Sequence, residues 1–509
     1  MRTTPLAPGA AAPEVGDAAL VVAVEGGRIA GTRGSDGVAA WLGVPYAAAP
    51  IGRLRWRPPA RVDAWRGVRD ARAFAPQCLQ AARPADSVYA EYAGIQPMSE
   101  DCLHLNVWSA APPGERWPVM VWIHGGAFQQ GSGANPVFVR GDLPRHGVVL
   151  VTLNYRLGPF GFFAHPALAT ESPHHTSGNY GLLDCAAALA WVQRNIAAFG
   201  GDPDQVTVFG QSAGAGAIVD LMASPRTLAL FDRAIAQSFG VTPMRSSDDA
   251  ELSGREFARR IGADHLEALR TLPADVLLAR YLEQPERWMP IVDGAFIVEP
   301  VIETFRAGRE HPVPLLTGWN RDEGTTFAPA QDAFAFGRRL SSRFGARADD
   351  AARFYPFSRD DEARAASRAL IGDDLFAWGV WRAARDHARG APTWLYHFEH
   401  AQPFAPTQRY VEAEDARALG VFHSSEYPYV FGSTAVLTRP WRDADRRMTS
   451  LMQSLWLAFA KTGRPDAAGV PRWPTFVDTE PTVLRLATEP VLVDVPRRAE
   501  LAFLDGTVA

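Results

Sequence analysis

The sequence predicts an α/β protein with a large, mostly parallel central sheet flanked by helices. Several short segments are apolar throughout, which is typical of strands that are covered on both faces. Segments with helical spacing lie between them, and strands that alternate with helices favour a doubly wound sheet. The chain has 509 residues, of which 47% are hydrophobic and 21% are charged, as in an ordinary globular protein.

The first expected elements are antiparallel hairpins, because Leu20–Val24 and Gly37–Leu42 are short apolar strands separated by Gly-rich turns. Strands of the central sheet are expected, in order, at Leu105–Trp108, Pro118–Ile123, Val148–Leu153, Val206–Phe209, Arg233–Gln237, Val313–Thr317 and Thr393–Phe398. Between the third and fourth of these, Leu182–Ala198 has the apolar spacing of a helix.

Two long stretches, about 248–287 and 327–389, hold helix-forming residues and no convincing strand. We expect them to be helical insertions that form a cap over the edge of the sheet, where folds of this class bind their ligands. No low-complexity linker or internal repeat divides the chain. Residues 1–509 are therefore expected to form one large domain.

Composition and charge exclude several classes of function. The 51 Lys and Arg residues against 56 Asp and Glu give a net charge of -5, which does not attract nucleic acid. The longest apolar runs fall well short of the ~20 residues that span a bilayer. The Pro- and Ala-rich start has no apolar core of a secretory signal, so we expect a cytoplasmic protein, with a secreted form still open. The three cysteines lack metal-ligand spacing.

The strongest chemical motif is Gly210-Gln211-Ser212-Ala213-Gly214, which follows the expected strand Val206–Phe209 and precedes an Ala-rich helical stretch. A G-x-S-x-G between a strand and a helix is typical of a nucleophile elbow, a turn so sharp that its flanking positions are glycine. A Gly-rich loop without a role is the alternative. The strand before the motif and the helix after it favour Ser212 as a nucleophile.

A serine nucleophile needs a base and an orienting acid, which in this fold follow it in the order acid, then histidine. The turn after the expected strand Val313–Thr317 offers Asp322 and Glu323. His400 and His423 come after the next strand. His400 lies very close to the end of its strand, so position favours His423 as the base, whereas position does not choose between the two acids.

A developing oxyanion needs backbone N–H donors. The expected strand Pro118–Ile123 ends in His124-Gly125-Gly126-Ala127-Phe128, the HGG-type loop of the α/β-hydrolase fold, whose amides join that of Ala213. Each half of this pattern could be a plain Gly-rich turn. Their joint occurrence in the right order favours an oxyanion hole.

With these motifs in place, the chain resembles the type-B carboxylesterases, a family of α/β-hydrolases that includes the cholinesterases and related fungal lipases. The resemblance covers about residues 26–476. It rests on these ordered matches: Gly43-Val44-Pro45-Tyr46-Ala47, Ser99-Glu100-Asp101-Cys102-Leu103-His104-Leu105-Asn106-Val107, Asn154-Tyr155-Arg156-Leu157-Gly158, Asn179-Tyr180-Gly181-Leu182-Leu183-Asp184, Phe199-Gly200-Gly201-Asp202-Pro203, Gln237-Ser238 and Asp322-Glu323-Gly324.

The resemblance implies a catalytic triad of Ser212, Glu323 and His423, since the family's acid is the second residue of its D-E-G. It also implies that the oxyanion donors are the amides of Gly126, Ala127 and Ala213. Further residues are implied in supporting roles: the hydroxyl of Ser238 and the buried carboxylate of Glu426 behind the triad, a disulfide between Cys78 and Cys102, and an ion pair between Arg55 and Glu100.

Several positions depart from the family pattern. The residue before the nucleophile is commonly Glu and is Gln211 here, while Phe239 and Ser424 replace glycines. The loop between the first two cysteines supplies a choline-stacking tryptophan in cholinesterases, but here its aromatic residues are only Tyr89 and Tyr92.

The expected activity is that of a serine carboxylesterase that hydrolyses neutral carboxylic esters of small molecules through an acyl-enzyme, with no metal or organic cofactor. One alternative is a non-catalytic adhesion or scaffold protein of the same fold, and another is a lipase for long-chain esters with an exposed apolar flap. Phe128, Phe239 and Trp288 are candidates for lining the substrate pocket, and core packing explains each equally well. The acyl and alcohol preference and the oligomeric state are not predicted.

Overall fold

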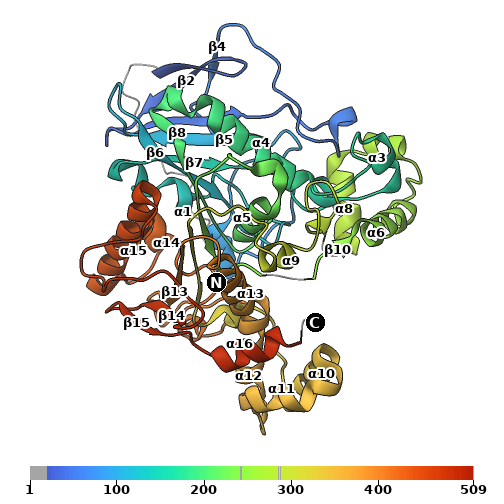
Figure 1. Ribbon diagram of the computed structural model, residues 1–509. Coiled ribbons are helices and arrows are strands. Elements are labelled where there is room, and N and C mark those ends of the chain that lie inside the picture. Colours follow the sequence, from blue (N-terminus) through green and yellow to red (C-terminus); the bar gives the residue numbers. More distant parts are fainter. Residues whose placement is uncertain (1–19, 241–242, 285, 287, 508–509) are drawn as a thin grey trace, which may run out of the picture.

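The computed structural model describes residues 20–240, 243–284, 286 and 288–507 (Figure 1). The Pro- and Ala-rich start of the chain, on which the expectation of no secretory signal depends, lies outside these residues. Within them, no helix is both long and apolar enough to cross a membrane.

One thirteen-stranded sheet runs through the described part of the chain, in the order β1-β2-β3-β5-β7-β6-β8-β9-β12-β13-β14-β15, with β4 beside β2. Its strands are β1 (Leu20–Val24), β2 (Gly27–Arg33), β3 (Ala39–Pro45), β4 (Val68–Asp70), β5 (His104–Ser109), β6 (Trp117–Ile123), β7 (Val149–Leu153), β8 (Gly201–Gln211), β9 (Arg233–Gln237), β12 (Leu315–Asn320), β13 (Thr393–Phe398), β14 (Thr482–Leu486) and β15 (Val491–Asp494). Neighbours from β7 to β14 pair in parallel. The strands at both ends pair antiparallel, except that β4 pairs in parallel with β2. The predicted α/β fold with a mostly parallel central sheet is confirmed.

Strand β6 explains why its segment is apolar throughout. Val119, Val121 and Ile123 point into one hydrophobic core, whereas Met120 and Trp122 point into a second core on the opposite face. The first core is closed by α4 (Tyr180–Asn195) and α5 (Ala213–Ala223), and the second by α15 (Asp443–Thr462), which lies on the other side of the sheet (Figure 1). Because both faces are covered, neither face of β6 needs polar residues.

The sequence did not predict β2, because Gly27 and Gly31 make the segment look like a turn. The structure shows why small residues are needed there. A side chain at Gly27, or at the preceding Gly26, would collide with the ring of Trp65, which packs directly on the backbone. The strand therefore forms with glycines that reduce its intrinsic preference for the extended state.

Both predicted insertions are helical. The first contains α6 (Ser247–Arg260), α7 (Leu266–Thr271) and α8 (Ala274–Glu283). The second contains α10 (Ala333–Phe344), α11 (Ala348–Phe354), α12 (Asp360–Gly372), the π-helix Asp373–Ala377 and α13 (Trp378–His387). The two insertions lie at separate places on the molecule (Figure 1), and only the second supplies described residues to the cavities at the site below.

Candidate active site

Ser212 sits at the turn between β8 and α5, in a backbone conformation that residues with a side chain rarely adopt, with φ of 57° and ψ of -128°. A side chain at Gly214 would collide with the carbonyl oxygen of Ile123, and one at Gly210 would come within 2.7 Å of the same atom. Both flanking glycines are therefore required for the close approach of this turn to β6. The predicted nucleophile elbow is present.

His423 and Glu323 form the pair that the sequence predicted. The Glu323 carboxylate lies 2.6 Å from Nδ1 of His423, and both side chains are almost fully buried. The other carboxylate oxygen accepts a hydrogen bond from the backbone N–H of Asn320 at 2.7 Å. With Nδ1 facing a carboxylate, that nitrogen carries the ring proton, and Nε2 is left as the basic nitrogen.

The two alternatives that the sequence left open have other partners. His400 binds Asp445 through Nε2 at 2.7 Å and does not line the cavity over Ser212. Asp322 pairs with Arg321 at 2.8 Å and accepts the backbone N–H of Val421. These contacts hold the loop that carries His423. The structure thus brings Glu323 and His423 together, and not Asp322 or His400.

A buried network behind Glu323 was only partly predicted. Glu426, expected from the resemblance, accepts hydrogen bonds from the side-chain amides of Asn320 at 2.7 Å and Gln237 at 3.1 Å. Burial, followed by repulsion from Glu323, raises the pKa of Glu426 to about 7. Asn320 was missed because nothing in the sequence marks it except its position at the end of β12. The predicted Ser238 is also buried, but its hydroxyl makes no hydrogen bond to any described residue.

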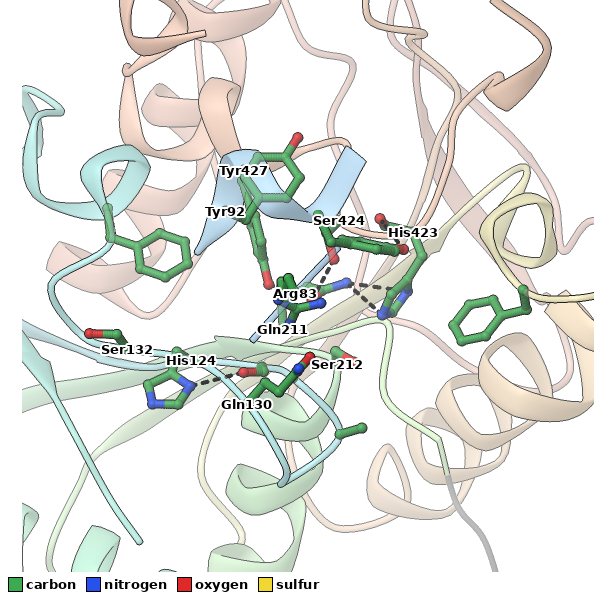
Figure 2. Close-up of a pocket in the computed structure, with 17 residues that line it drawn as sticks. Arg83, Tyr92, His124, Gln130, Ser132, Gln211, Ser212, His423, Ser424 and Tyr427 are labelled. Atoms are coloured by element: carbon green, nitrogen blue, oxygen red, sulfur yellow. Dashed lines mark hydrogen bonds between the residues drawn. The ribbon is translucent and has the colours of Figure 1, made fainter. Parts of the chain in front are cut away.

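Gln211 contacts His423 directly. Its side-chain nitrogen lies 3.3 Å from both ring nitrogens of His423, while its oxygen accepts hydrogen bonds from Ser424 at 3.0 Å and Tyr427 at 2.7 Å (Figure 2). No hydrogen bond among the described residues joins the Ser212 hydroxyl to His423. The two departures from the family pattern, Gln211 and Ser424, are therefore partners of each other.

Two aromatic rings pack against the imidazole of His423, one on its face and one tilted to it, and neither was predicted. Phe376, in the π-helix, stacks on His423 with ring centroids 4.2 Å apart, and Phe327 lies 5.7 Å away. Both belong to the second insertion. No sequence pattern predicts this contact, because it depends on how the insertion folds back over the sheet.

The predicted oxyanion loop follows β6, and Ala127 and Phe128 have positive φ values of 56° and 59°. A side chain at Gly126 would collide with the carbonyl oxygen of Gln130. Among the described residues, the amides of Gly126, Ala127 and Ala213 donate to no protein acceptor. Three unsatisfied N–H groups beside a nucleophile elbow are suited to bind a negatively charged oxygen.

A first cavity of about 160 Å³ opens over Ser212 (Figure 2). Side chains and backbone from the oxyanion loop, the elbow and the His423 loop line it together with Arg83, Tyr89 and Tyr92. His124 also lines it. Burial is the main reason that the pKa of His124 falls to about 4, so this histidine is neutral near pH 7 and does not compete as a base.

A second, larger cavity of about 740 Å³ begins behind the oxyanion loop. Two of the three predicted pocket residues, Phe128 and Phe239, line it. The prediction that Trp288 lines the substrate pocket is wrong. Trp288 lines neither of these cavities and packs among Phe163, Phe257 and Tyr281 instead. Core packing, the alternative explanation for Trp288, is what the structure shows.

Two further contacts implied by the resemblance can be compared with the structure. Arg55 and Glu100 form a two-bond ion pair, with both distances 2.6 Å, as expected. Cys78 and Cys102 are both buried free thiols that lie against each other. Their bridge therefore stays a prediction. In the described ranges, no group of three His, Cys, Asp or Glu side chains could hold a metal ion.

The strained serine turn, the histidine–carboxylate pair and the unpaired amides on a mostly parallel sheet together define a serine hydrolase of the α/β-hydrolase class. A family model described as the carboxylesterase family matches residues 18–504, and the chain belongs to that family. It is a carboxylic ester hydrolase.

Relatives of known activity agree with this class. The chain is 38% identical over 483 residues to fumonisin B1 esterase of Sphingopyxis macrogoltabida, covering 91% of this chain and 86% of that protein. It is 35% identical over 501 residues to para-nitrobenzyl esterase of Bacillus subtilis (strain 168), with 94% and 96% covered. A solved structure of a PNB esterase superposes with a TM-score of 0.83 at 33% identity, covering 95% of this chain and 99% of that one. These matches support the enzyme over the non-catalytic scaffold considered above.

Proposed function

We propose that the protein hydrolyses carboxylic esters at Ser212, with His423 as the general base and Glu323 as the acid that orients it. The observation that carries this assignment is the 2.6 Å contact between Glu323 and Nδ1 of His423, next to the cavity over Ser212. The contact puts the ring proton on Nδ1, so Nε2 is the nitrogen that can take the serine proton.

The reaction divides into two steps. The Ser212 oxygen attacks the ester carbonyl carbon while its proton passes to Nε2 of His423, and the amides of Gly126, Ala127 and Ala213 hold the oxyanion. The C–O bond to the alcohol then breaks, and His423 returns the proton to the leaving oxygen. A water molecule repeats the sequence on the acyl-enzyme and releases the carboxylic acid, and Glu323 stabilises the imidazolium throughout.

Gln211 lies beside the base of this scheme, where the glutamate common in the family would add a negative charge. Its amide nitrogen lies 3.3 Å from Nε2 of His423, at the site where the serine hydroxyl must donate. Being neutral, Gln211 adds no charge beside the imidazolium. Ser424 and Tyr427 hold the oxygen of the same amide, so the serine hydroxyl must share Nε2 with the Gln211 nitrogen.

The test is hydrolysis of p-nitrophenyl acetate by Ser212→Ala, His423→Ala and His400→Ala variants. His400→Ala is the matched control, because this histidine also binds a buried carboxylate but lies away from the cavity. We expect Ser212→Ala and His423→Ala to lower kcat by roughly 10⁴-fold or more and His400→Ala to change it less than about tenfold. Near-normal turnover by Ser212→Ala would disprove the assignment.

A further inference from the structure

Arg83 is the only permanently charged side chain among the described residues that line the cavity over Ser212. It comes from the loop between Cys78 and Cys102 and points into the cavity near Gln211 (Figure 2). It is partly buried, and its guanidinium lies over the ring of Tyr89, 5.6 Å from the centroid. Among the described residues it has no hydrogen-bond acceptor and no carboxylate within ion-pair distance.

The carboxylate whose charge acts on Arg83 already accepts hydrogen bonds from other donors. Glu412, whose charge acts on Arg83 from a distance, accepts hydrogen bonds from the Ser87 hydroxyl and the Val88 amide. Burial lowers the pKa of Arg83, but a guanidinium does not lose its proton in a protein. The cavity therefore contains a partly desolvated cation whose donors face the space above Ser212.

A partly buried charge without a partner is unfavourable, and a ligand that supplies the partner recovers that cost. The planar guanidinium fork matches a carboxylate, which it binds through two parallel hydrogen bonds. Tyr89 holds the fork in place, since its own hydroxyl bonds to Thr326 at 2.7 Å and to the backbone oxygen of His423 at 3.1 Å.

We propose that Arg83 binds a carboxylate on the substrate, so that the enzyme prefers esters that carry a free carboxylate a short distance from the scissile bond. This inference rests on the proposed function and narrows its substrate class. Arg83 is a specificity-determining residue here and takes no part in bond breaking.

The test compares esters that differ only in charge. One pair is monomethyl glutarate and its monoamide, in which a neutral carboxamide of the same shape replaces the carboxylate on the acyl side. The other is O-acetylglycolate and its amide, with the carboxylate on the alcohol side. Both pairs are assayed with wild type, Arg83→Gln and Arg83→Lys, and with Arg53→Gln, an exposed arginine outside the cavities, as control.

We expect Arg83→Gln to lower kcat/KM for the carboxylate ester of at least one pair by about 10- to 100-fold, while the amide ester changes less than about threefold. Arg83→Lys should recover only part of the loss. Equal losses on both members of each pair, or no loss on either, would overturn the proposal. If every variant still hydrolyses the esters that carry a neutral carboxamide, the triad assignment holds. A failure of this proposal can therefore be told apart from a failure of the proposed function.

A separate observation concerns Asp220 in the second cavity. It lies on α5, eight positions after Ser212, and lines the cavity with 9% of its surface exposed. The other acids of the cavity wall, Glu303 and Asp374, are paired with Arg306 and Arg343. Asp220 alone among these acids has no hydrogen bond or ion pair with any described residue.

None of the ionisable groups described around Asp220 pairs with its carboxylate. Burial alone raises its pKa to about 8. Cys185, on the neighbouring α4, is a buried thiol whose raised pKa keeps it neutral. Across the cavity, Glu303, Asp374 and Arg343 are held in their own pairs. Most of the remaining wall is apolar, which is suited to the hydrocarbon part of a ligand.

From this second observation we infer that the cavity receives an arm of the ester that ends in an ammonium group, which Asp220 binds. Eight helical residues rise about 12 Å, so the arm must span roughly that distance from the scissile carbonyl. An aliphatic chain would contact Phe128, Val219 and Phe239 along the wall before it reaches Asp220.

The test uses p-nitrophenyl nonanoate and its ω-amino analogue, in which an ammonium replaces the terminal methyl, and the acetates of nonanol and of the matching amino alcohol. Asp220→Asn is compared with Asp275→Asn, an exposed aspartate on α8. We expect the wild-type ratio of kcat/KM, amine over methyl, to rise by up to about tenfold between pH about 7 and 9 as Asp220 ionises, and to be flat in Asp220→Asn.

A ratio that stays flat in wild type for both ester types, or that falls as pH rises, would overturn this second proposal. The control variant should retain the wild-type rise. Since the methyl esters do not need the carboxylate, their hydrolysis reports the triad separately, and a loss of both esters in Asp220→Asn would indicate only a damaged fold.

Discussion

Replacing Asp220 by asparagine should make the stability of the protein less dependent on pH. Asparagine keeps the shape of the side chain and removes the ionisable group. In the folded protein, burial raises the pKa of Asp220 from its ordinary value of 3.8 to about 8. Because the folded pKa lies above the unfolded one, the folded state holds the proton more tightly, and stability is lost as the pH rises from about 4 to about 8.

The magnitude follows from the two pKa values. A pKa difference of one corresponds to about 1.4 kcal/mol, so the full penalty of ionising Asp220 in its cavity is about 6 kcal/mol well above pH about 8. Asp220→Asn does not carry this penalty. The variant and wild type should therefore unfold with similar free energies near pH about 4, and the variant should be more stable by several kcal/mol near pH about 9.

The assay is urea unfolding followed by tryptophan fluorescence at several pH values, with reversibility checked at each one. Asp275→Asn, which changes an exposed carboxyl, is the control and should shift the free energy of unfolding by less than about 0.5 kcal/mol at every pH. A stability difference between Asp220→Asn and wild type that does not grow with pH would refute the reasoning. It would mean that Asp220 is hydrated or paired in the folded protein.

Three other predictions concern the catalytic machinery and its surroundings. Glu323→Gln should lower kcat by roughly 10³- to 10⁴-fold with the fold intact, as judged by an unchanged circular dichroism spectrum, because the imidazolium loses its partner; full activity would contradict the role of this acid. Cys78 and Cys102 should form a bridge on mild oxidation, which would close a loop of about 25 residues and add roughly 3 kcal/mol to stability; two alkylatable thiols after oxidation, found by mass spectrometry, would count against it. The glycines of the oxyanion loop leave room for a branched alcohol, so we expect measurable hydrolysis of tert-butyl acetate, and Gly126→Val should lower that rate more than the rate with ethyl acetate. No turnover of the tert-butyl ester, even by a Phe239→Gly variant, would disprove the last prediction.

The local features of the site could be predicted from the sequence because short-range geometry determines them. Ser212 and its glycines form one turn, and a strand before it and a helix after it are visible as patterns. Glu323 and His423 were found through chain order and a family resemblance. Strands β2 and β14 were missed. Gly27 and Gly31 weaken the strand pattern of β2, and β14 is as long as several strands that were predicted, so strand pairing depends on neighbours as well as on a segment's own composition.

The residues that the sequence did not reveal are those whose roles depend on what lies opposite them. Arg83 is one of 51 cationic residues, and only the fold shows that it points into the cavity without a partner. Asp220 looks like a polar position on an Ala-rich helix until the cavity beside it is known. Phe376 reaches His423 only because an insertion returns over the sheet. Tertiary contacts of this kind leave no short-range pattern.

The pair formed by His400 and Asp445 shows which nitrogen of an imidazole a carboxylate must bind if the ring is to act as a base. In His423 the carboxylate binds Nδ1, so the outer nitrogen, at the tip of the ring, is free to reach a substrate. In His400 it binds Nε2, so the free nitrogen is the one next to the main chain, where a nucleophile cannot approach easily. In His387 one nitrogen faces Glu310 and the other faces the carbonyl oxygen of Val313, which leaves none. A search for new catalytic sites by histidine–carboxylate distance alone would select these three rings and also His397, whose Nδ1 lies 2.9 Å from Glu399. The choice of nitrogen excludes His400 and His387, and His397 differs from His423 because it does not line the cavity over Ser212.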